Sequence, residues 1–180
     1  MLVGAGILVG MYWPDQLALG RRSNLGDREA TIRAGIRAIA ALPGVELIAA
    51  SSLVQTPALK PEGSQADAPD YLNAVVTART TLDPHDLLQS MHAIERDHGR
   101  VRDVRWGDRT LDIDVIEFGC LMIASGDLTV PHPRAADRAF VLAPWAEIEP
   151  DATLPGRGRI DALLAATGES PSIYPAEPLL

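Results

Sequence analysis

Apolar residues recur along the chain with the 3.6-residue period of helices in three places. In the segment 23–44, isoleucines repeat at helical spacing, and a Pro-Gly pair ends the pattern. A second helix is predicted over 83–99, because Asp83 before Pro84 is a typical N-terminal cap and the sequence then continues amphipathically. A shorter helix is predicted at 159–167.

Strands are predicted where β-branched and apolar residues cluster or alternate, at 15–20, 45–56, 71–82 and 111–118. The intervening segment 57–70 is rich in Pro, Gly and Ser, and a loop of this length is usually functional or disordered. The resulting order, β-α-β-β-α-β, predicts an α+β protein of the ferredoxin-like class. We expect an antiparallel sheet with its helices on one face, followed by a C-terminal extension.

The two ends of the chain differ from this central pattern. Residues 1–14 are mostly apolar but lack a basic start and are too short for a membrane helix, so we expect an extra strand or a loose extension. Residues 15–170 form the single predicted domain, in keeping with a length of 180 residues. The Pro-rich residues 171–180 are expected to be a loose tail.

Composition narrows the possible partners and compartments. A net charge of −8 argues against broad binding to nucleic acid, which depends on many Lys and Arg contacts. The single cysteine, Cys120, excludes an internal disulfide framework and favours a reducing cytoplasm. We expect a cytoplasmic monomer that binds small molecules and no membrane.

Two aspartates stand two residues apart in the predicted strand 111–118. In a strand, Asp112 and Asp114 share one face, whereas the apolar residues between and beside them share the other. Neighbouring carboxylates raise each other's pKa unless a cation lies between them, and a metal ion is the simplest such cation. The alternative is a half-exposed strand whose polar face happens to carry two acids.

Basic residues crowd the segment before these aspartates, although the protein as a whole is acidic. Four arginines fall within ten residues, at Arg100, Arg102, Arg105 and Arg109. An anion bound together with a metal would suit both signs of charge. A solvated, arginine-rich loop is the alternative.

Six segments carry a resemblance to a known family. Between Asp15 and Pro150 the chain contains, in this order, SNLGDR, SSLVQTPAL, PDYLNAVV, IERDHGRVR, RWGDRTLDIDVIEFG and LTVPHPRAADRAFVLAPWAEI. Together they resemble the 6-hydroxymethyl-7,8-dihydropterin pyrophosphokinases, and RWGDRTLDID is a specific signature by itself. The resemblance implies an ATP-dependent enzyme of folate biosynthesis that transfers pyrophosphate to the pterin alcohol and releases AMP.

The resemblance also implies roles for individual residues. Asp112 and Asp114 correspond to a pair that binds two Mg²⁺ ions, and hard oxygen ligands of this kind suit Mg²⁺. Arg100 and Arg102 correspond to loop arginines that close over the nucleotide, so these two and the two aspartates are the expected catalytic residues. The residues expected to bind ATP are His92, Glu95, Arg100, Trp106, Arg109, His132 and Arg138.

A flat pterin ring requires stacking and amide-like hydrogen bonds. Tyr71 and Phe140 can supply rings, and Asn73 can pair with the edge of the pterin through its amide. The full set implied by the resemblance is Thr56, Leu59, Tyr71, Asn73, Trp106 and Phe140.

The match departs from the family pattern near the start, where Arg21 and Arg22 are inserted before the Ser-Asn turn. Two other classes of protein therefore stay open. A catalytically impaired relative would retain ATP binding without modifying pterin, and a ferredoxin-like binding module would carry these charges only on its surface.

Overall fold

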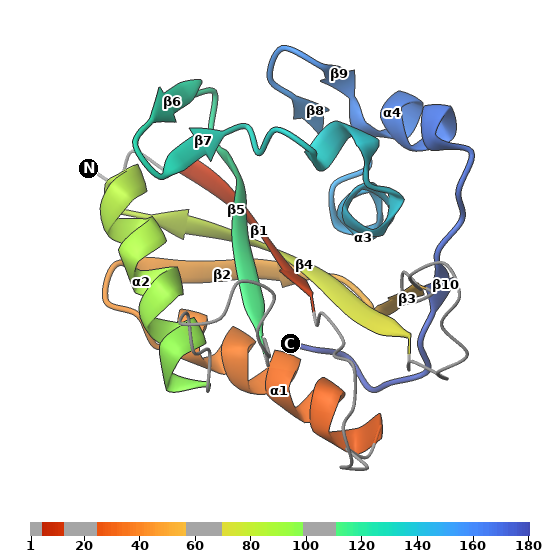
Figure 1. The fold of residues 1–180 in the computed structure, drawn as a ribbon, viewed down its shortest axis with the longest axis horizontal. Coiled ribbons are helices and arrows are strands. Elements are labelled where there is room, and N and C mark those ends of the chain that lie inside the picture. Colours follow the sequence, from red (N-terminus) through yellow and green to blue (C-terminus); the bar gives the residue numbers. More distant parts are fainter. Residues whose placement is uncertain (1–4, 13–24, 57–69, 99–110) are drawn as a thin grey trace, which may run out of the picture.

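The computed structural model describes residues 5–12, 25–56, 70–98 and 111–180, and its centre is an antiparallel sheet (Figure 1). The strands run in the order β10-β3-β4-β1-β5, and β2 pairs with the far half of β4. Every pairing in this sheet is antiparallel. The strands are β1 (Ala5–Tyr12), β2 (Val45–Ala50), β3 (Val54–Thr56), β4 (Tyr71–Thr80), β5 (Asp112–Phe118) and β10 (Ser172–Ile173).

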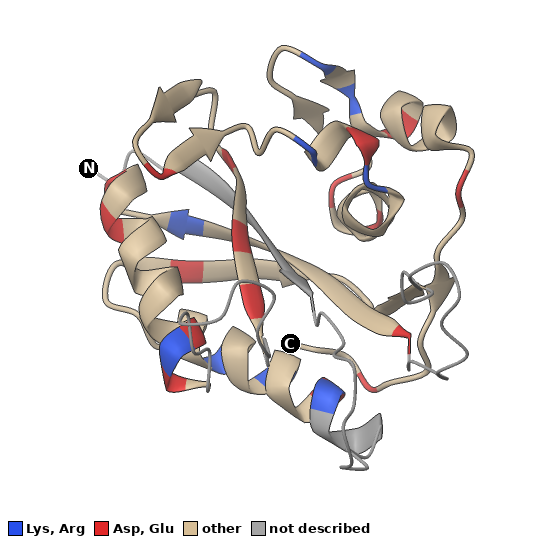
Figure 2. Ribbon diagram, viewed as in Figure 1, with Lys and Arg blue, Asp and Glu red and all other residues tan. Residues whose placement is uncertain are grey.

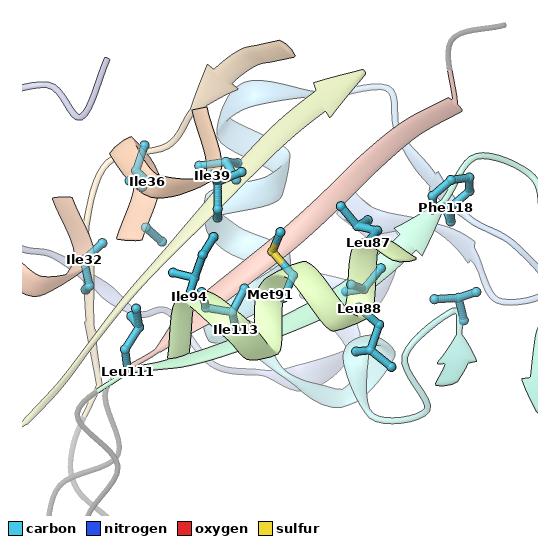
Figure 3. Close-up of a cluster of buried hydrophobic side chains, with 14 of the residues drawn as sticks. Ile32, Ile36, Ile39, Leu87, Leu88, Met91, Ile94, Leu111, Ile113 and Phe118 are labelled. Carbon is cyan, nitrogen blue, oxygen red and sulfur yellow. The ribbon is translucent and has the colours of Figure 1, made fainter. Parts of the chain in front are cut away.

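Helices cover both faces of the sheet. Helices α1 (Leu25–Ala40) and α2 (Pro84–Asp97) pack on one face, in a core that includes Ile113 and Val115 of β5 (Figure 3). Helix α3 (Ala139–Ile148) packs on the other face, in a core that includes Val75 and Ile116, and α4 (Ile160–Thr167) packs on α3. The α+β class and the antiparallel sheet are thus confirmed. The two helices of the predicted β-α-β-β-α-β unit do lie on one face, and the chain adds a second, unpredicted helical layer on the other face.

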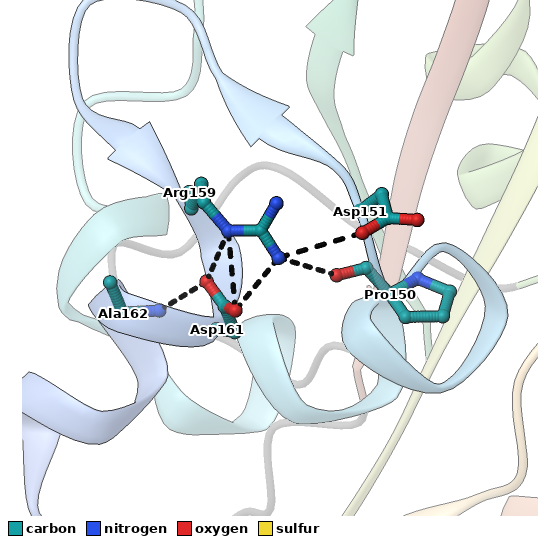
Figure 4. Close-up of polar contacts among 5 residues, drawn as sticks. All are labelled: Pro150, Asp151, Arg159, Asp161 and Ala162. Atoms are coloured by element: carbon teal, nitrogen blue, oxygen red, sulfur yellow. Dashed lines mark hydrogen bonds and ion pairs between the residues drawn. The ribbon is translucent and has the colours of Figure 1, made fainter.

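Short elements connect the second helical layer to the sheet. A hairpin of β6 (Ile123–Ser125) and β7 (Leu128–Val130) leads into the 3-10 helix η1 (Ala135–Asp137). A second hairpin, β8 (Thr153–Leu154) with β9 (Gly158–Arg159), lies between α3 and α4. Arg159 ties this hairpin to the end of α3 through Pro150 and Asp151, and to the start of α4 through Asp161 (Figure 4).

The predicted start of α2 is confirmed, but the predicted strand 45–56 is two strands in the structure. The Asp83 carboxylate accepts hydrogen bonds from the His85 and Asp86 N–H groups at 2.9 Å, which is the predicted cap of α2. The predicted strand 45–56 is interrupted, because Ser51 bonds through its backbone and its hydroxyl to Val75 and so separates β2 from β3. None of the helices within the described ranges is long and apolar enough to cross a membrane.

The N-terminal end of the chain forms the extra strand that was one of its two predicted states, whereas the C-terminal end differs from the sequence prediction. The strand predicted at 15–20 lies outside the described residues. The apolar segment before it supplies β1, which pairs with β4 on one side and β5 on the other. The tail expected to be loose contributes β10 to the sheet.

A bulge in β5 determines which residues of its second half face which core. The backbone of Leu8 pairs with Glu117 and that of Val9 with Val115, so Ile116 has no partner in β1. The extra residue lets Phe118 join the core beneath α1 and α2 while Ile116 joins the core beneath α3. Glu117 then lies near Glu149, whose carboxylate accepts a hydrogen bond from Trp145 Nε1 at 3.0 Å.

We predict that Glu117→Gln will make stability less dependent on pH. Burial, assisted by the Glu149 carboxylate, raises the pKa of Glu117 from 4.5 to about 7. Between these values the folded protein holds the proton more tightly than the unfolded chain does, so the free energy of unfolding falls as pH rises through this window. Urea denaturation between about pH 5 and pH 8 should show this fall in the parent and a flatter profile in the variant. Glu169→Gln, at an exposed position, is the matched control, and an equal flattening there would contradict the assignment.

Candidate active site

The two aspartates predicted to share a face do so in the structure. Asp112 is 2% exposed and the Asp114 side chain 25% exposed. Leu111, Ile113 and Val115 point the other way, into the core with α1 and α2. Figure 2 shows the acidic positions along β5. The period of the strand therefore separates the carboxylates from the core, as the sequence predicted.

Two basic side chains approach Asp114 from the segment after β7. His132 Nε2 and Arg138 Nη1 each lie 3.6 Å from Asp114 Oδ2. The His132 N–H donates to the Ile116 carbonyl at 2.8 Å, which holds this segment against the outer edge of β5. His132 and Arg138, which lie 18 and 24 residues after Asp114 in the sequence, are thus brought to it by this backbone hydrogen bond and by the packing of η1.

The protonation of His132 follows from its neighbours. The Arg134 N–H donates to His132 Nδ1 at 3.2 Å, so the ring proton belongs on Nε2, which faces Asp114. Burial lowers the pKa of His132 more strongly than the Asp114 carboxylate raises it, and Arg138 adds to the lowering. His132 therefore presents a neutral N–H donor to this site near neutral pH.

Glu95 of α2 holds the backbone of β5, the strand that carries the two aspartates, through a hydrogen bond. It is fully buried on α2, and its Oε1 accepts a hydrogen bond from the Ile113 N–H at 2.8 Å. Ile113 lies between the two aspartates, so this bond fixes the backbone that carries both. Glu95 is not among the described residues that line the adjacent cavity. A direct contact between Glu95 and ATP stays a prediction.

A cavity of about 320 Å³ lies beside the aspartates. Its walls come from α2, β5 and the β6–β7 hairpin, and they comprise Leu88, His92, residues 112–115, residues 127–129, His132 and Pro133. Two residues predicted to bind ATP, His92 and His132, thus lie in the wall of one cavity, and their binding of ATP stays a prediction. Leu88 was missed, although its position four residues before His92 places both on one helix face. Asp127 and Thr129 were also missed, and no sequence pattern singles them out.

Three of the residues expected to hold pterin, Thr56, Tyr71 and Asn73, lie on the same face of the sheet as the aspartates. Thr56 of β3 pairs with Tyr71 of β4, and Asn73 Nδ2 donates to Thr56 Oγ1 at 3.3 Å and to the Val54 carbonyl at 3.4 Å. Helix α3 packs over β3 and β4 and carries Phe140.

Arg138 joins the two groups of residues. Its guanidinium carbon lies 5.4 Å from the centre of the Phe140 ring, and its Nη1 faces Asp114. The aspartates and the ring are therefore linked by one cation. Five predicted site residues lie outside the described part of the chain: Leu59, Arg100, Arg102, Trp106 and Arg109.

The donor set fits a magnesium ion that is bound together with a substrate. Within the described ranges, no group of three or more His, Cys, Asp or Glu side chains is placed to hold a metal ion. Mg²⁺ typically takes one or two carboxylates, several waters and the oxygens of a phosphate substrate. Asp112 and Asp114, both in the wall of the cavity, match that requirement.

We predict that Glu95→Leu will destabilise the protein and raise the Mg²⁺ concentration needed for activity. The substitution removes the acceptor of the Ile113 N–H, and an orphaned buried donor costs about 1–3 kcal/mol. Glu95→Gln keeps an acceptor oxygen and is the matched control, with a smaller effect on both quantities. Chemical denaturation and a Mg²⁺ titration of initial rates measure them. Equal behaviour of the two variants would show that the hydrogen bond to β5 is not what matters.

Comparisons with known proteins identify the family of the chain. Residues 16–150 match the family model described as 7,8-dihydro-6-hydroxymethylpterin-pyrophosphokinase. The chain is 43% identical over 150 residues to a 2-amino-4-hydroxy-6-hydroxymethyldihydropteridine pyrophosphokinase of Pseudomonas aeruginosa, covering 83% of this chain and 89% of that protein. It is 41% identical over 145 residues to the protein of the same name from Methylorubrum extorquens, covering 81% and 89%.

Solved structures support the fold. The Plasmodium falciparum HPPK-DHPS crystal structure with pteroate matches with a TM-score of 0.64 at 12% identity. The match covers 91% of this chain and 42% of that longer chain, and at this identity it bears on the fold alone. The family model and the two bacterial relatives span most of the sequence, and the chain belongs to the 7,8-dihydro-6-hydroxymethylpterin-pyrophosphokinase family.

Proposed function

We propose that the chain transfers pyrophosphate from ATP to 6-hydroxymethyl-7,8-dihydropterin in the space between the Asp112–Asp114 pair and α3. The activity is that of its family. The observation that supports this location is the convergence of two carboxylates and His132 on the wall of one cavity, with Arg138 Nη1 3.6 Å from Asp114 Oδ2. Such a set can hold the negative charge of a triphosphate together with its counter-ions.

Asp112 and Asp114 would hold Mg²⁺, with two ions expected. When bound, the ions neutralise phosphate oxygens and polarise the phosphorus that is attacked. The buried hydrogen bond from Ile113 to Glu95 keeps the two carboxylates in a fixed relation, so little reorganisation is needed when the substrates bind.

The basic groups would act on the phosphates directly. Arg138 offers a planar guanidinium that suits phosphate oxygens, and its position over Phe140 keeps that plane oriented. His132 offers a neutral Nε2–H donor beside the same oxygen of Asp114 that Arg138 faces. Arg100, Arg102, Trp106 and Arg109 complete the nucleotide side in the prediction from sequence.

The pterin would lie between Phe140 and the end of β4. Phe140 supplies a ring for stacking. Asn73 supplies an amide, and it lies in the last residue pair between β4 and β3, opposite Val54. This placement puts the pterin hydroxymethyl group on the Arg138 side of the pocket, toward the aspartates. The attacking oxygen and the phosphates would then meet near Asp114.

We also infer a ferredoxin-like topology. The strand order β3-β4-β1-β5, with α1 after β1 and α2 after β4, supports it. A cytoplasmic location and a monomeric state stay predictions from the sequence.

We predict that Asp114→Asn will lower turnover roughly 100-fold or more, because it removes a charged metal ligand while keeping the size of the side chain. Asp112→Asn should behave in the same way. The assay mixes protein, Mg²⁺, ATP and the pterin alcohol, and follows AMP and the pterin diphosphate.

Asp137→Asn is the matched control, since Asp137 is an exposed carboxylate in the same region. Near-parental turnover by the Asp114 variant at saturating Mg²⁺ would overturn the metal assignment. A parent protein that binds ATP without forming AMP would instead indicate an impaired relative.

A further inference from the structure

The C-terminal segment 172–180, here called the C-terminal strap, lies beyond the residues matched by the family model. It adds strand β10 to the outer edge of β3, where Ser172 pairs with Gln55 and Ile173 with Val54. The Tyr174 N–H then donates to the Leu53 carbonyl at 2.8 Å. The strap therefore pairs with two of the three residues of β3, Val54 and Gln55, and with Leu53 just before them.

The far end of the strap is fixed to α1. Arg33 donates from Nη1 to the Pro178 carbonyl at 2.8 Å and from Nη2 to the Glu177 carbonyl at 2.5 Å. Tyr174 and Leu179 pack against the core beneath α1 and α2. The chain can be followed in Figure 1 from α4 through β10 to the C-terminus beside α1. The strap thus connects the edge of the sheet to a helix.

The strand that the strap holds carries a residue of the proposed pterin pocket. Strand β3 has three residues, and its last residue, Thr56, pairs with Tyr71. Asn73 Nδ2 donates to Val54 O and Thr56 Oγ1, so a shift of β3 would change the direction of the Asn73 amide. A three-residue strand paired on one side would be a weak edge, and β10 supplies the second side.

A second connection from α1 reaches the same place. Arg28, which is 3% exposed, donates from Nη1 to the Asp70 carbonyl, and Gln55 Nε2 donates to the Asp70 carboxylate at 2.6 Å. Asp70 directly precedes Tyr71 at the start of β4. Helix α1, the strap, β3 and β4 therefore form a closed ring of contacts around this corner of the sheet.

We propose that the C-terminal strap is a positioning element for the pterin pocket, acting through β3 on Thr56 and Asn73. The inference rests on the proposed placement of pterin beside these two residues. The strap contacts β3 and α1, whereas the nucleotide cavity is walled by α2, β5 and the β6–β7 hairpin. Loosening the strap should therefore affect pterin binding and leave ATP binding alone.

The test compares Arg33→Met with Glu29→Gln. Arg33→Met keeps an aliphatic stem but removes both donors to the strap, whereas Glu29→Gln removes the charge that pairs with Arg33 Nε and leaves those donors in place. We expect Arg33→Met to raise the KM for pterin roughly tenfold, with the KM for ATP and kcat within about twofold of the parent. Glu29→Gln should match the parent in all three quantities.

Two further measurements keep the test decisive. Hydrogen–deuterium exchange at the Tyr174 amide should be faster in Arg33→Met than in Glu29→Gln, and Tyr174→Ala should reproduce the change in pterin KM. An unchanged pterin KM in both Arg33→Met and Tyr174→Ala, or equal rises for pterin and ATP, would overturn the proposal.

Asn73→Ala separates failure of the strap from failure of the pocket. If Asn73→Ala raises the pterin KM and the strap variants do not, the strap has no positioning role. If Asn73→Ala leaves the pterin KM unchanged, the pterin lies elsewhere, and the action of the strap through Asn73 is refuted with it.

Discussion

The two-residue period of β5 is the constraint on which the site depends. It places Asp112 and Asp114 on the face toward α3 while Leu111, Ile113 and Val115 enter the core with α1 and α2. A one-residue slip of this strand would bury two carboxylates in an apolar core, at a cost that no partner there could offset. Burial of the apolar face therefore fixes the orientation of the acidic face, and the stability of the fold and the geometry of the site share one origin.

Two side chains from the segment that leads into α3 lie beside the Asp114 carboxylate on the acidic face of β5. His132 and Arg138 come from the segment between β7 and α3, which is positioned by the core around Trp145 and Ile116. Each stands 3.6 Å from Asp114, a distance that leaves the carboxylate with weak direct bonds to them. The Arg138 cation is thus near enough to favour the charged carboxylate, and both side chains are far enough from it to admit a ligand between them.

Sequence reasoning located the elements whose pattern is local. The helical repeats gave α1, α2 and the region of α4, and the alternation around Asp112 gave the facing of β5. It did not find α3, because Pro144 within that helix removes one backbone donor and is normally a sign of a helix end. It joined β2 and β3, because the break at Ser51 depends on a hydrogen bond to Val75, far along the chain.

The candidate site could likewise be predicted only where its residues form a local pattern or a family signature. A pair of aspartates at strand spacing is visible in one segment, and a family signature extends the prediction to His132 and Arg138. Asp127 enters the cavity wall because the β6–β7 hairpin folds beside β5, which no local pattern reports. The strap was expected to be loose because its composition is Pro-rich, yet Arg33 and Leu53 supply partners for its backbone groups.

The site lies at the boundary between two separately packed layers. The aspartates belong to the sheet, whose position is set by the core with α1 and α2, whereas Phe140, Arg138 and His132 belong to the layer of α3. Ser52 and Glu147 join these layers on the pterin side, since the Glu147 carboxylate accepts from both the Ser52 N–H and its hydroxyl at 2.9 Å. On the aspartate side the corresponding bond is that of the His132 N–H to Ile116. The proposed pocket is therefore held on both sides by hydrogen bonds that join the sheet to the layer of α3.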